Sequence, residues 1–158
     1  MSSAEEAYLA LIKSGGGDST EADTLALFDQ LKPILPEVLV GEWDGSTFDF
    51  HAQHPVTLRM QQMGWVGKTF RSSTDVDSFV GRGQGGERVP IEATGNARIF
   101  EVKFRGIVSA TLVFNDKIDY FRYLDENTVA GIYEDKDVAA SGLLHFYLTR
   151  CPSSACSS

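Results

Sequence analysis

Hydrophobic positions are spaced at helical intervals in the first part of the chain. Leu25, Phe28 and Leu31 recur every three residues, so on a helix they would form one apolar stripe. Serine or threonine precedes this segment and an earlier one, and both residue types cap helix N-termini. We expect one helix from Ser2 or Ser3 to the glycines at 15–17, and a second from Ser19 or Thr20 to about Leu31.

From residue 97 the pattern changes to alternation, which is typical of strands. Phe100, Val102 and Phe104 alternate with charged side chains, as in a strand with one buried face. The alternation resumes after Gly106, and turn signals follow at residues 115–116, 125–127 and 135–137. We therefore expect five consecutive short strands in an antiparallel meander, whose closure into a barrel would remove its exposed edges.

Two tryptophans, each placed between glycines, mark the entry into further strands. Trp43 lies in the run Gly41-Glu42-Trp43-Asp44-Gly45, and Trp65 lies between Gly64 and Gly67. Glycine lets another chain approach closely, and tryptophan supplies a large apolar plate with one N–H that needs a partner. We expect Trp43 to plug one end of a barrel.

The segments around these strands are predicted to be connections. Pro55 suits the first position of a helix, and an apolar i, i+4, i+7 spacing predicts a short helix over residues 55–63. Residues 71–96 contain glycines among charges, and the run 81–86 resembles a dinucleotide fingerprint only weakly. Because no strand–turn–helix pattern surrounds that run, we expect a mobile surface loop there.

The charge balance excludes several classes of partner. The 158 residues carry a formal charge of −8, whereas nucleic-acid and anionic-membrane binders need a basic face. No apolar run is long enough to span a bilayer, and the N-terminus lacks the pattern of a signal peptide. We expect a cytoplasmic single domain over residues 1–150, with a helical part at 1–35 and a barrel at 40–150. An exposed Phe/Tyr face on the meander would favour a homodimer.

The only two cysteines lie near the C-terminus. A disulfide between Cys151 and Cys156 would close a very small loop, so it would contribute little to the fold. We expect residues 151–158 to form a flexible tail.

The ordered motifs resemble a known family. Residues 27–31, 41–45, 54–55 and 64–68 are similar to the GXWXG domain, and the second half is similar to the domain of unknown function that usually follows it. The second-half matches are Ala97-Arg98, Phe104-Arg105-Gly106, Val108-Ser109-Ala110, Asp116, Ile118-Asp119-Tyr120-Phe121-Arg122, Asp125, Thr128-Val129, Gly131 and Phe146-Tyr147-Leu148-Thr149-Arg150. The resemblance implies a mainly β fold, a small antiparallel lipocalin-like (calycin-type) barrel with N-terminal helices, and it implies no established activity.

Asp119 is the strongest candidate for chemistry. On an alternating strand Asp119 and Arg122 face opposite sides, so one of the two charges should point inward. A buried carboxylate needs a cation or several donors, and Lys68 and Arg105 are the candidate partners. Such a pair is either a structural ion pair or an acid/base group in a pocket.

Histidine offers a second candidate. His145 on the last strand is similar to the haem ligand of nitrobindin-type barrels, which also carry an early Gly-x-Trp-x-Gly motif, and it would bind iron only if it faced inward. His51 and His54 lack the context of a metal site, and His54 is expected to cap the helix that begins at Pro55. No metal site is expected, and haem is the minor alternative to a protein without a cofactor.

These residues lead to three hypotheses about function. The preferred one is a cofactor-independent isomerase or cyclase that encloses a lipophilic small molecule and uses Asp119, Lys68 and His145 as catalytic groups. The others are a non-catalytic carrier of a lipophilic ligand and a haem barrel. The remaining candidates, all expected to bind the ligand, are Trp43, His54, Trp65, Arg105, Tyr120, Phe121, Arg122, Tyr133 and Tyr147.

Overall fold

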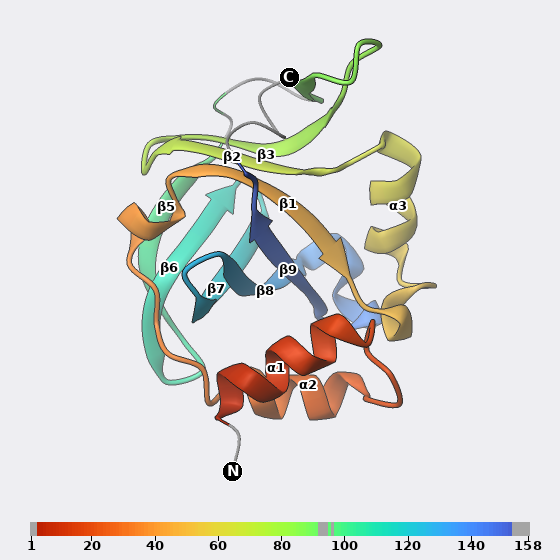
Figure 1. Cartoon of the computed structure of the whole chain (residues 1–158), viewed down its shortest axis with the longest axis vertical. Coiled ribbons are helices and arrows are strands. Elements are labelled where there is room, and N and C mark those ends of the chain that lie inside the picture. The colour runs from red at the N-terminus through yellow and green to blue at the C-terminus, as the bar shows by residue number, and fades with distance from the viewer. Residues whose placement is uncertain (1–2, 92–94, 96, 153–158) are drawn as a thin grey trace.

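A computed structural model describes residues 3–91, 95 and 97–152. Within this part of the chain, nine antiparallel strands form one strongly curled sheet, a half-barrel, and the N-terminal helices cover part of its outer side (Figure 1). The strand order is β4-β3-β2-β1-β9-β8-β7-β6-β5, so β4 and β5 are the edge strands. The mainly β architecture with N-terminal helices agrees with the sequence prediction.

The elements have the following bounds. The strands are β1 Gly41–Thr47, β2 Gly67–Ser72, β3 Asp75–Arg82, β4 Arg88–Pro90, β5 Arg98–Phe104, β6 Ile107–Phe114, β7 Lys117–Asp125, β8 Thr128–Asp135 and β9 Leu144–Arg150. The helices are α1 Ala4–Lys13, α2 Glu21–Phe28 and α3 Pro55–Met63, with short 3-10 turns η1 Pro36–Leu39, η2 Asp49–His51 and η3 Lys136–Ser141.

Side-chain caps fix where the two N-terminal helices begin. The Ser3 hydroxyl accepts a hydrogen bond from the N–H of Glu6, and Thr20 forms a reciprocal capping box with Asp23. Both helices were predicted, but α2 ends at Phe28, before Leu31. The chain leaves the α-helix there because the N–H groups of residues 30 and 31 bond to carbonyls only three residues back.

The strands of the meander β5 to β9 form as predicted, but the prediction for the buried face of β5 is wrong at Phe100. Phe100 is 49% exposed, whereas its neighbour Ile99 is buried in the inner core. Adjacent strands pair in order, with Phe100 opposite Thr111, Tyr120 opposite Ile132, and Gly131 opposite Phe146. β9 then pairs with β1, which carries the strand order on to β2, β3 and β4. The two tryptophan segments therefore do add strands to the sheet, as expected.

The prediction of a mobile surface loop over residues 71–96 is wrong for most of that range. Asp75–Arg82 is a strand with a buried run at its centre, and Arg88–Pro90 returns against it, so the glycine-rich run is the connection of a hairpin. Val76, Phe79 and Val80 supply the apolar side chains that make β3 a core strand. Serine and aspartate between them concealed the alternation. Residues 92–94 and 96 lie outside the described residues.

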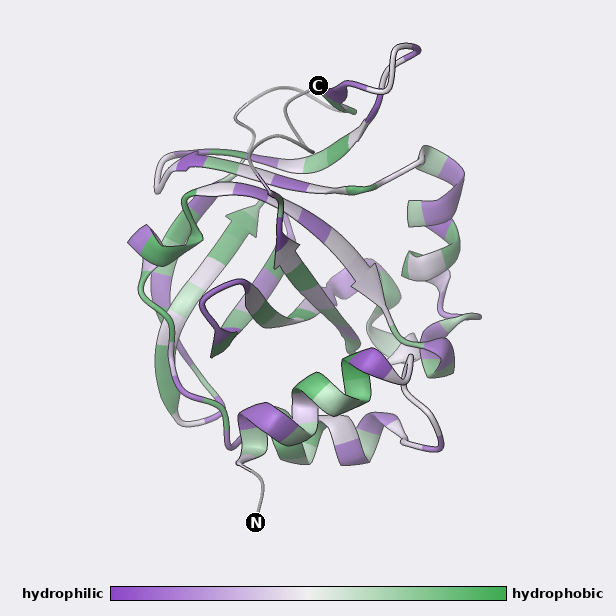
Figure 2. Ribbon diagram, in the orientation of Figure 1, coloured by the Kyte–Doolittle hydropathy of each residue, from purple (hydrophilic) through white to green (hydrophobic). Residues whose placement is uncertain are grey.

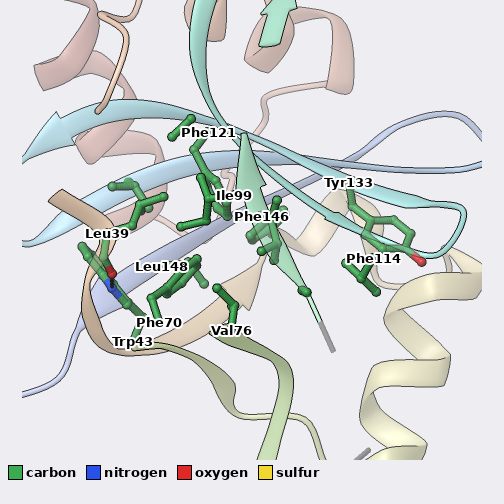
Figure 3. Packing of buried hydrophobic residues seen from close by; sticks show 14 of the residues in the cluster. Leu39, Trp43, Phe70, Val76, Ile99, Phe114, Phe121, Tyr133, Phe146 and Leu148 are labelled. Carbon is green, nitrogen blue, oxygen red and sulfur yellow. Dashed lines mark hydrogen bonds between the residues drawn. The ribbon is translucent and has the colours of Figure 1, made fainter. Parts of the chain in front are cut away.

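The curled sheet separates two hydrophobic cores. The inner core lies within the curve and includes Trp43, Phe70, Phe121 and Phe146 (Figure 3). The outer core lies between the convex face and the N-terminal helices; its buried members are Tyr8, Leu11, Phe28, Leu31, Phe48, Leu124, Ala130 and Ile132. Figure 2 shows that α1 and α2 carry both hydrophobic and hydrophilic residues, as expected for helices with one buried face. Among the described residues, no helix combines the length and hydropathy that a membrane span requires.

Trp43 anchors the first strand to the inner core. Its side chain is fully buried, and its indole N–H donates to the carbonyl of Leu39 at 2.7 Å. The guanidinium of Arg150 lies 4.3 Å from the indole centre and donates to the carbonyls of Val38 and Val40. The motif tryptophan thus holds η1, β1 and the end of β9 together.

The segment after β9 begins in close contact with the sheet. The N–H of Cys151 donates to the carbonyl of Glu42 at 2.9 Å, and Cys151 is disulfide-bonded. The rest of the predicted flexible tail, from residue 153 and including Cys156, lies outside the described residues.

Candidate functional site

A buried ion pair lies inside the curve of the sheet. Lys68 on β2 places its Nζ 2.9 Å from Oδ2 of Asp119 on β7, and the two side chains are 4% and 1% exposed. β2 and β7 are far apart in the strand order, and only the curl of the sheet brings these side chains together. Two charges removed from water need each other, because an unpaired ion at this depth would cost several kcal/mol.

Aromatic rings surround the ammonium group. Nζ of Lys68 lies 5.6 to 5.8 Å from the ring centres of Trp65, Phe79, Phe114 and Phe146. It also donates to the carbonyl of Ser78 at 3.1 Å. Rings and carbonyl both favour the charged lysine. The Lys68 side chain is thereby held in place within a mostly apolar environment.

Asp119 is satisfied less completely than its partner. Burial raises the pKa of the Asp119 carboxyl, and the charge of Lys68 opposes that rise. Its Oδ1 is buried and accepts no hydrogen bond from any described residue. A buried acceptor without a donor is costly, so Oδ1 leaves a hydrogen-bonding capacity unfilled among the described residues.

An apolar cavity of about 190 Å³ opens beside this pair. Its lining comes from β1, α3, β2, β7, β8 and β9 and consists of Gly45, Ser46, Thr47, Thr57, Met60, Gln61, Trp65, Lys68, Asp119, Tyr133, Leu144 and Phe146. Apolar walls with a few polar groups are the usual composition of a small-molecule site. The cavity therefore combines one buried ion pair with mostly apolar walls.

Tyr133 adds an oriented hydroxyl to the cavity wall. Its O–H donates to Oδ2 of Asp135 at 2.8 Å, and a guanidinium nitrogen of Arg59 lies 3.8 Å from the same oxygen. Burial, and then the bond to Asp135, raise the pKa of Tyr133. Tyr133 is therefore a neutral group whose proton points away from Asp119.

The two glycines of the Trp43 motif have different tasks. A Cβ on Gly45 would lie 2.1 Å from the indole of Trp65, so only glycine leaves room for this cavity-lining ring. Gly41 has φ +134° and lies against the guanidinium of Arg150, so it belongs to the Trp43 anchor. One motif thus fixes the fold at its first glycine and shapes the cavity at its second.

The comparisons with known proteins agree with this geometry. Residues 26–86 match the model of the GXWXG protein family, and residues 95–150 match the model of a domain of unknown function, DUF4334. The chain belongs to the GXWXG family. A crystal structure of a protein from Thermomonospora curvata is 30% identical to this GXWXG protein, covers 94% of this chain and 99% of that one, and superposes with a TM-score of 0.84. No curated protein matches the chain significantly.

In this GXWXG protein, four of the predicted site residues line the cavity together: Lys68, Trp65, Asp119 and Tyr133. Trp43 and Phe121 also belong to the inner core, but they do not line the cavity. Lys68 rather than Arg105 is the partner of Asp119. Arg105 instead forms a half-exposed ion pair with Asp29, in which Nη2 lies 2.9 Å from Oδ2.

The remaining candidates lie on the outer side of the sheet. Arg122 is buried there and donates to the carbonyls of Phe28, Leu31 and Phe104. Tyr120 and Tyr147 pack against the outer core. His54 caps α3, as predicted: its Nδ1 accepts from the N–H of Val56, and its Nε2 contacts the carbonyl of Gly142 at 3.0 Å. These side chains are not brought to Asp119.

His145 is fully buried in the outer core and does not line the cavity. Its ring stacks on His51 at 5.8 Å, and its backbone N–H donates to Nε2 of His51. Burial lowers the pKa of His145 to about 3 and that of His51 to about 4. This position gives the haem hypothesis no support, because the ring faces packed side chains of the N-terminal helices and not an enclosed space. Among the described residues, no three potential metal ligands cluster.

Several lining residues were not identified from the sequence. Thr57, Met60 and Gln61 form the α3 wall, and Leu144 and Phe146 form the β9 wall. The β9 alternation had placed Leu144 and Phe146 on one face opposite His145, and that signal pointed to them. On α3 the apolar spacing predicts the helix and its apolar face, but not its position over the opening, because that position depends on the curl of the sheet.

Proposed function

We propose that this GXWXG protein is a cofactor-independent acid–base enzyme, an isomerase or cyclase, that acts on a lipophilic small molecule. The observation that carries the proposal is the Lys68–Asp119 pair, which is buried and yet faces a cavity of about 190 Å³. A carboxylate whose pKa is raised by burial is a stronger base than an exposed one and is suited to take and return a proton.

The two charged groups have complementary roles in this mechanism. Oδ1 of Asp119, which has no hydrogen-bond partner in the described structure, removes a proton from a carbon or hydroxyl of the substrate. The ammonium of Lys68 stabilises the negative charge that develops on the substrate oxygen. Asp119 then returns the same proton at another carbon, so no oxidant or second reactant is needed. The enclosing rings hold the substrate in a reactive conformer.

The frame that we propose for this chemistry is a calycin-type barrel. An isolated bridge between Val76 and Ala97, together with the bond from the N–H of Ile99 to the carbonyl of Ser73, supports closure of the curled sheet. Such a barrel can hold one small ligand among its inward side chains.

A carrier without catalytic activity is the second candidate. The observation that favours it is the completeness of the lysine environment, in which one carboxylate, one carbonyl and four rings already satisfy Lys68. A pair held in this way can also serve only to balance charge beneath a bound apolar molecule.

Mass spectrometry of molecules that co-purify with the protein, followed by turnover assays on them, separates the two candidates. We expect Asp119→Asn to lower kcat by at least about 100-fold in the folded variant, because general acid–base catalysis contributes on the order of 10² to 10⁴. Circular dichroism checks that the variant is folded, since it leaves Lys68 without its carboxylate. The matched control is Asp116→Asn, which removes one carboxylate at a 57% exposed position. Unchanged turnover in Asp119→Asn would exclude the acid–base role.

A further inference from the structure

A second hollow, of about 160 Å³, lies next to the cavity and is distinct in character. Its lining combines two cations and an amide with apolar side chains: Arg59, Met60, Met63, Phe79, Phe114, Asn115 and Lys117. Met60 lines both spaces. Phe79 and Phe114 meet edge to face at 5.3 Å, and both rings also face the ammonium of Lys68, so they form the wall between the hollow and the ion pair.

The cations of the hollow exceed the nearby negative charge. Asp135 is the carboxylate that they face, since it pairs in register with Lys117 and lies 3.8 Å from the guanidinium of Arg59. This contact exceeds hydrogen-bond length, and the Arg59 side chain remains 40% exposed. Lys117 is half-buried and forms no ion pair within the described residues. Two cations therefore share one carboxylate, and a net positive charge remains.

This local excess is unusual in a protein with a formal charge of −8. A partly buried lysine loses hydration, so a ligand anion that contacts it gains more than it would at an exposed lysine. The flexible side chain of Met60 separates the cationic hollow from the apolar cavity, and methionine adapts readily to a ligand that lies across it.

We propose that Arg59 and Lys117 bind the carboxylate of a lipophilic acid whose apolar body occupies the cavity. This inference rests on the proposed function only in that the cavity is the ligand site. It assigns the substrate class as an amphiphilic organic monoanion, with its acid group at the α3 opening and its reacting atoms at Lys68 and Asp119. The acid group of the ligand thus contributes to binding and takes no part in the proton transfer.

The test compares two probes of equal length, octanoate and octan-1-ol, by calorimetric titration at pH 7.5. We expect octanoate to bind about five- to tenfold more tightly to the unmodified protein. The double variant Arg59→Gln/Lys117→Gln should remove this preference and leave the affinity for octan-1-ol unchanged. Lys117→Gln alone, which keeps the Arg59–Asp135 contact, should remove part of it.

Two controls make the outcome decisive. Lys103→Gln removes one positive charge at an exposed position on β5, so it should keep the preference if the effect is local. Lys68→Met tests whether the carboxylate binds at the ion pair instead. The inference is overturned if the two probes bind equally, if neither binds, or if the preference survives in the double variant. If the unmodified protein prefers octanoate as expected but Asp119→Asn turns over substrate at an unchanged rate, the proposed enzymatic function is wrong and the carboxylate-binding site is still supported.

Discussion

Asp119 and Arg122 are three residues apart on β7, both are 1% exposed, and they lie on opposite sides of the sheet. Arg122 donates to three carbonyls and lies 4.8 Å from the ring centre of Phe28, so its charge is spread over a complete set of partners. Asp119 has one ammonium and an oxygen that receives no hydrogen bond from the described residues. The sequence predicted that one of the two charges faces inward, and the structure places Asp119 on the inner side with fewer partners than Arg122 has.

The stacked histidines of the outer core should make the fold sensitive to mild acid. Both pKa values lie below the ordinary value near 6.5, at about 3 for His145 and about 4 for His51. Because the folded pKa is depressed, each neutral imidazole contributes stability above pH 6.5, and this stability is lost as the pH falls toward 4 and 3. Between pH 7.5 and 5 we expect the free energy of unfolding to fall by about 2 kcal/mol for each histidine.

Urea unfolding of the unmodified protein and of His145→Phe at both pH values checks this expectation. Phenylalanine keeps an aromatic ring in the outer core but cannot take a proton, so the variant should lose about half of the pH dependence. Carboxylates with lowered pKa values, such as Asp77 and Asp135, affect stability mainly below pH 4 and are common to both proteins. An equal pH dependence in the two proteins would show that His145 is not buried in the neutral form.

At the scale of elements, β1 contributes both to the inner core and to the position of the cavity wall. Trp43 points into the inner core and bonds to η1, while Gly45, two residues on, makes room for the indole of Trp65 at the start of β2. The indole N–H of Trp65 in turn lies 3.3 Å from the carbonyl of Ser78 on β3. One short strand therefore sets the position of a cavity wall that belongs to another segment.

Gly45→Ala should displace this wall. The added methyl group would overlap the Trp65 ring, so we expect a loss of about 1–3 kcal/mol in the free energy of unfolding and a change in tryptophan fluorescence. Combining Gly45→Ala with Trp65→Leu should restore much of the stability, because the smaller side chain vacates the space. A double-mutant cycle by urea unfolding measures this coupling, and strictly additive effects would contradict the assigned contact.

The elements differ in how well the sequence predicted them, and the reason is physical. The meander from β5 to β9 and the helix at Pro55 follow from local spacing and from turn or cap residues, so they were identified. β3 was missed because its buried run includes the polar residues Asp77 and Ser78, which are typical of loops. Lys68 was named as a candidate partner of Asp119 because a buried carboxylate needs a cation. The contribution of α3 to the cavity wall was not predicted, because it depends on the curvature of the sheet, which no local pattern encodes.

At the scale of the whole molecule, one sheet serves two cores with separate tasks. The inner core contains the ion pair and the cavity, and the outer core attaches α1 and α2 through aromatic contacts such as that of Tyr8 with Phe48. Arg122 is one polar link between the N-terminal segment and the sheet, since it joins the carbonyl groups of residues 28 and 31 to that of Phe104 on β5. This division suggests that stability and ligand binding can be changed independently.

Arg122→Met tests that independence. Methionine fills similar space but removes the hydrogen bonds that Arg122 donates to three carbonyls, so we expect the free energy of unfolding to fall by about 3 kcal/mol or more. The unfolding free energy of Arg122→Lys should lie between those of Arg122→Met and the unmodified protein, because lysine keeps the positive charge but lacks the planar guanidinium group. The control is Arg105→Met, which removes a half-exposed ion pair worth about 1 kcal/mol at most.

Well below the melting temperature, the affinity of Arg122→Met for octan-1-ol should match that of the unmodified protein, since the probe binds on the opposite face of the sheet. A parallel loss of probe binding would mean that the N-terminal helices shape the cavity through the sheet, and the two cores would then have to be treated as one cooperative unit.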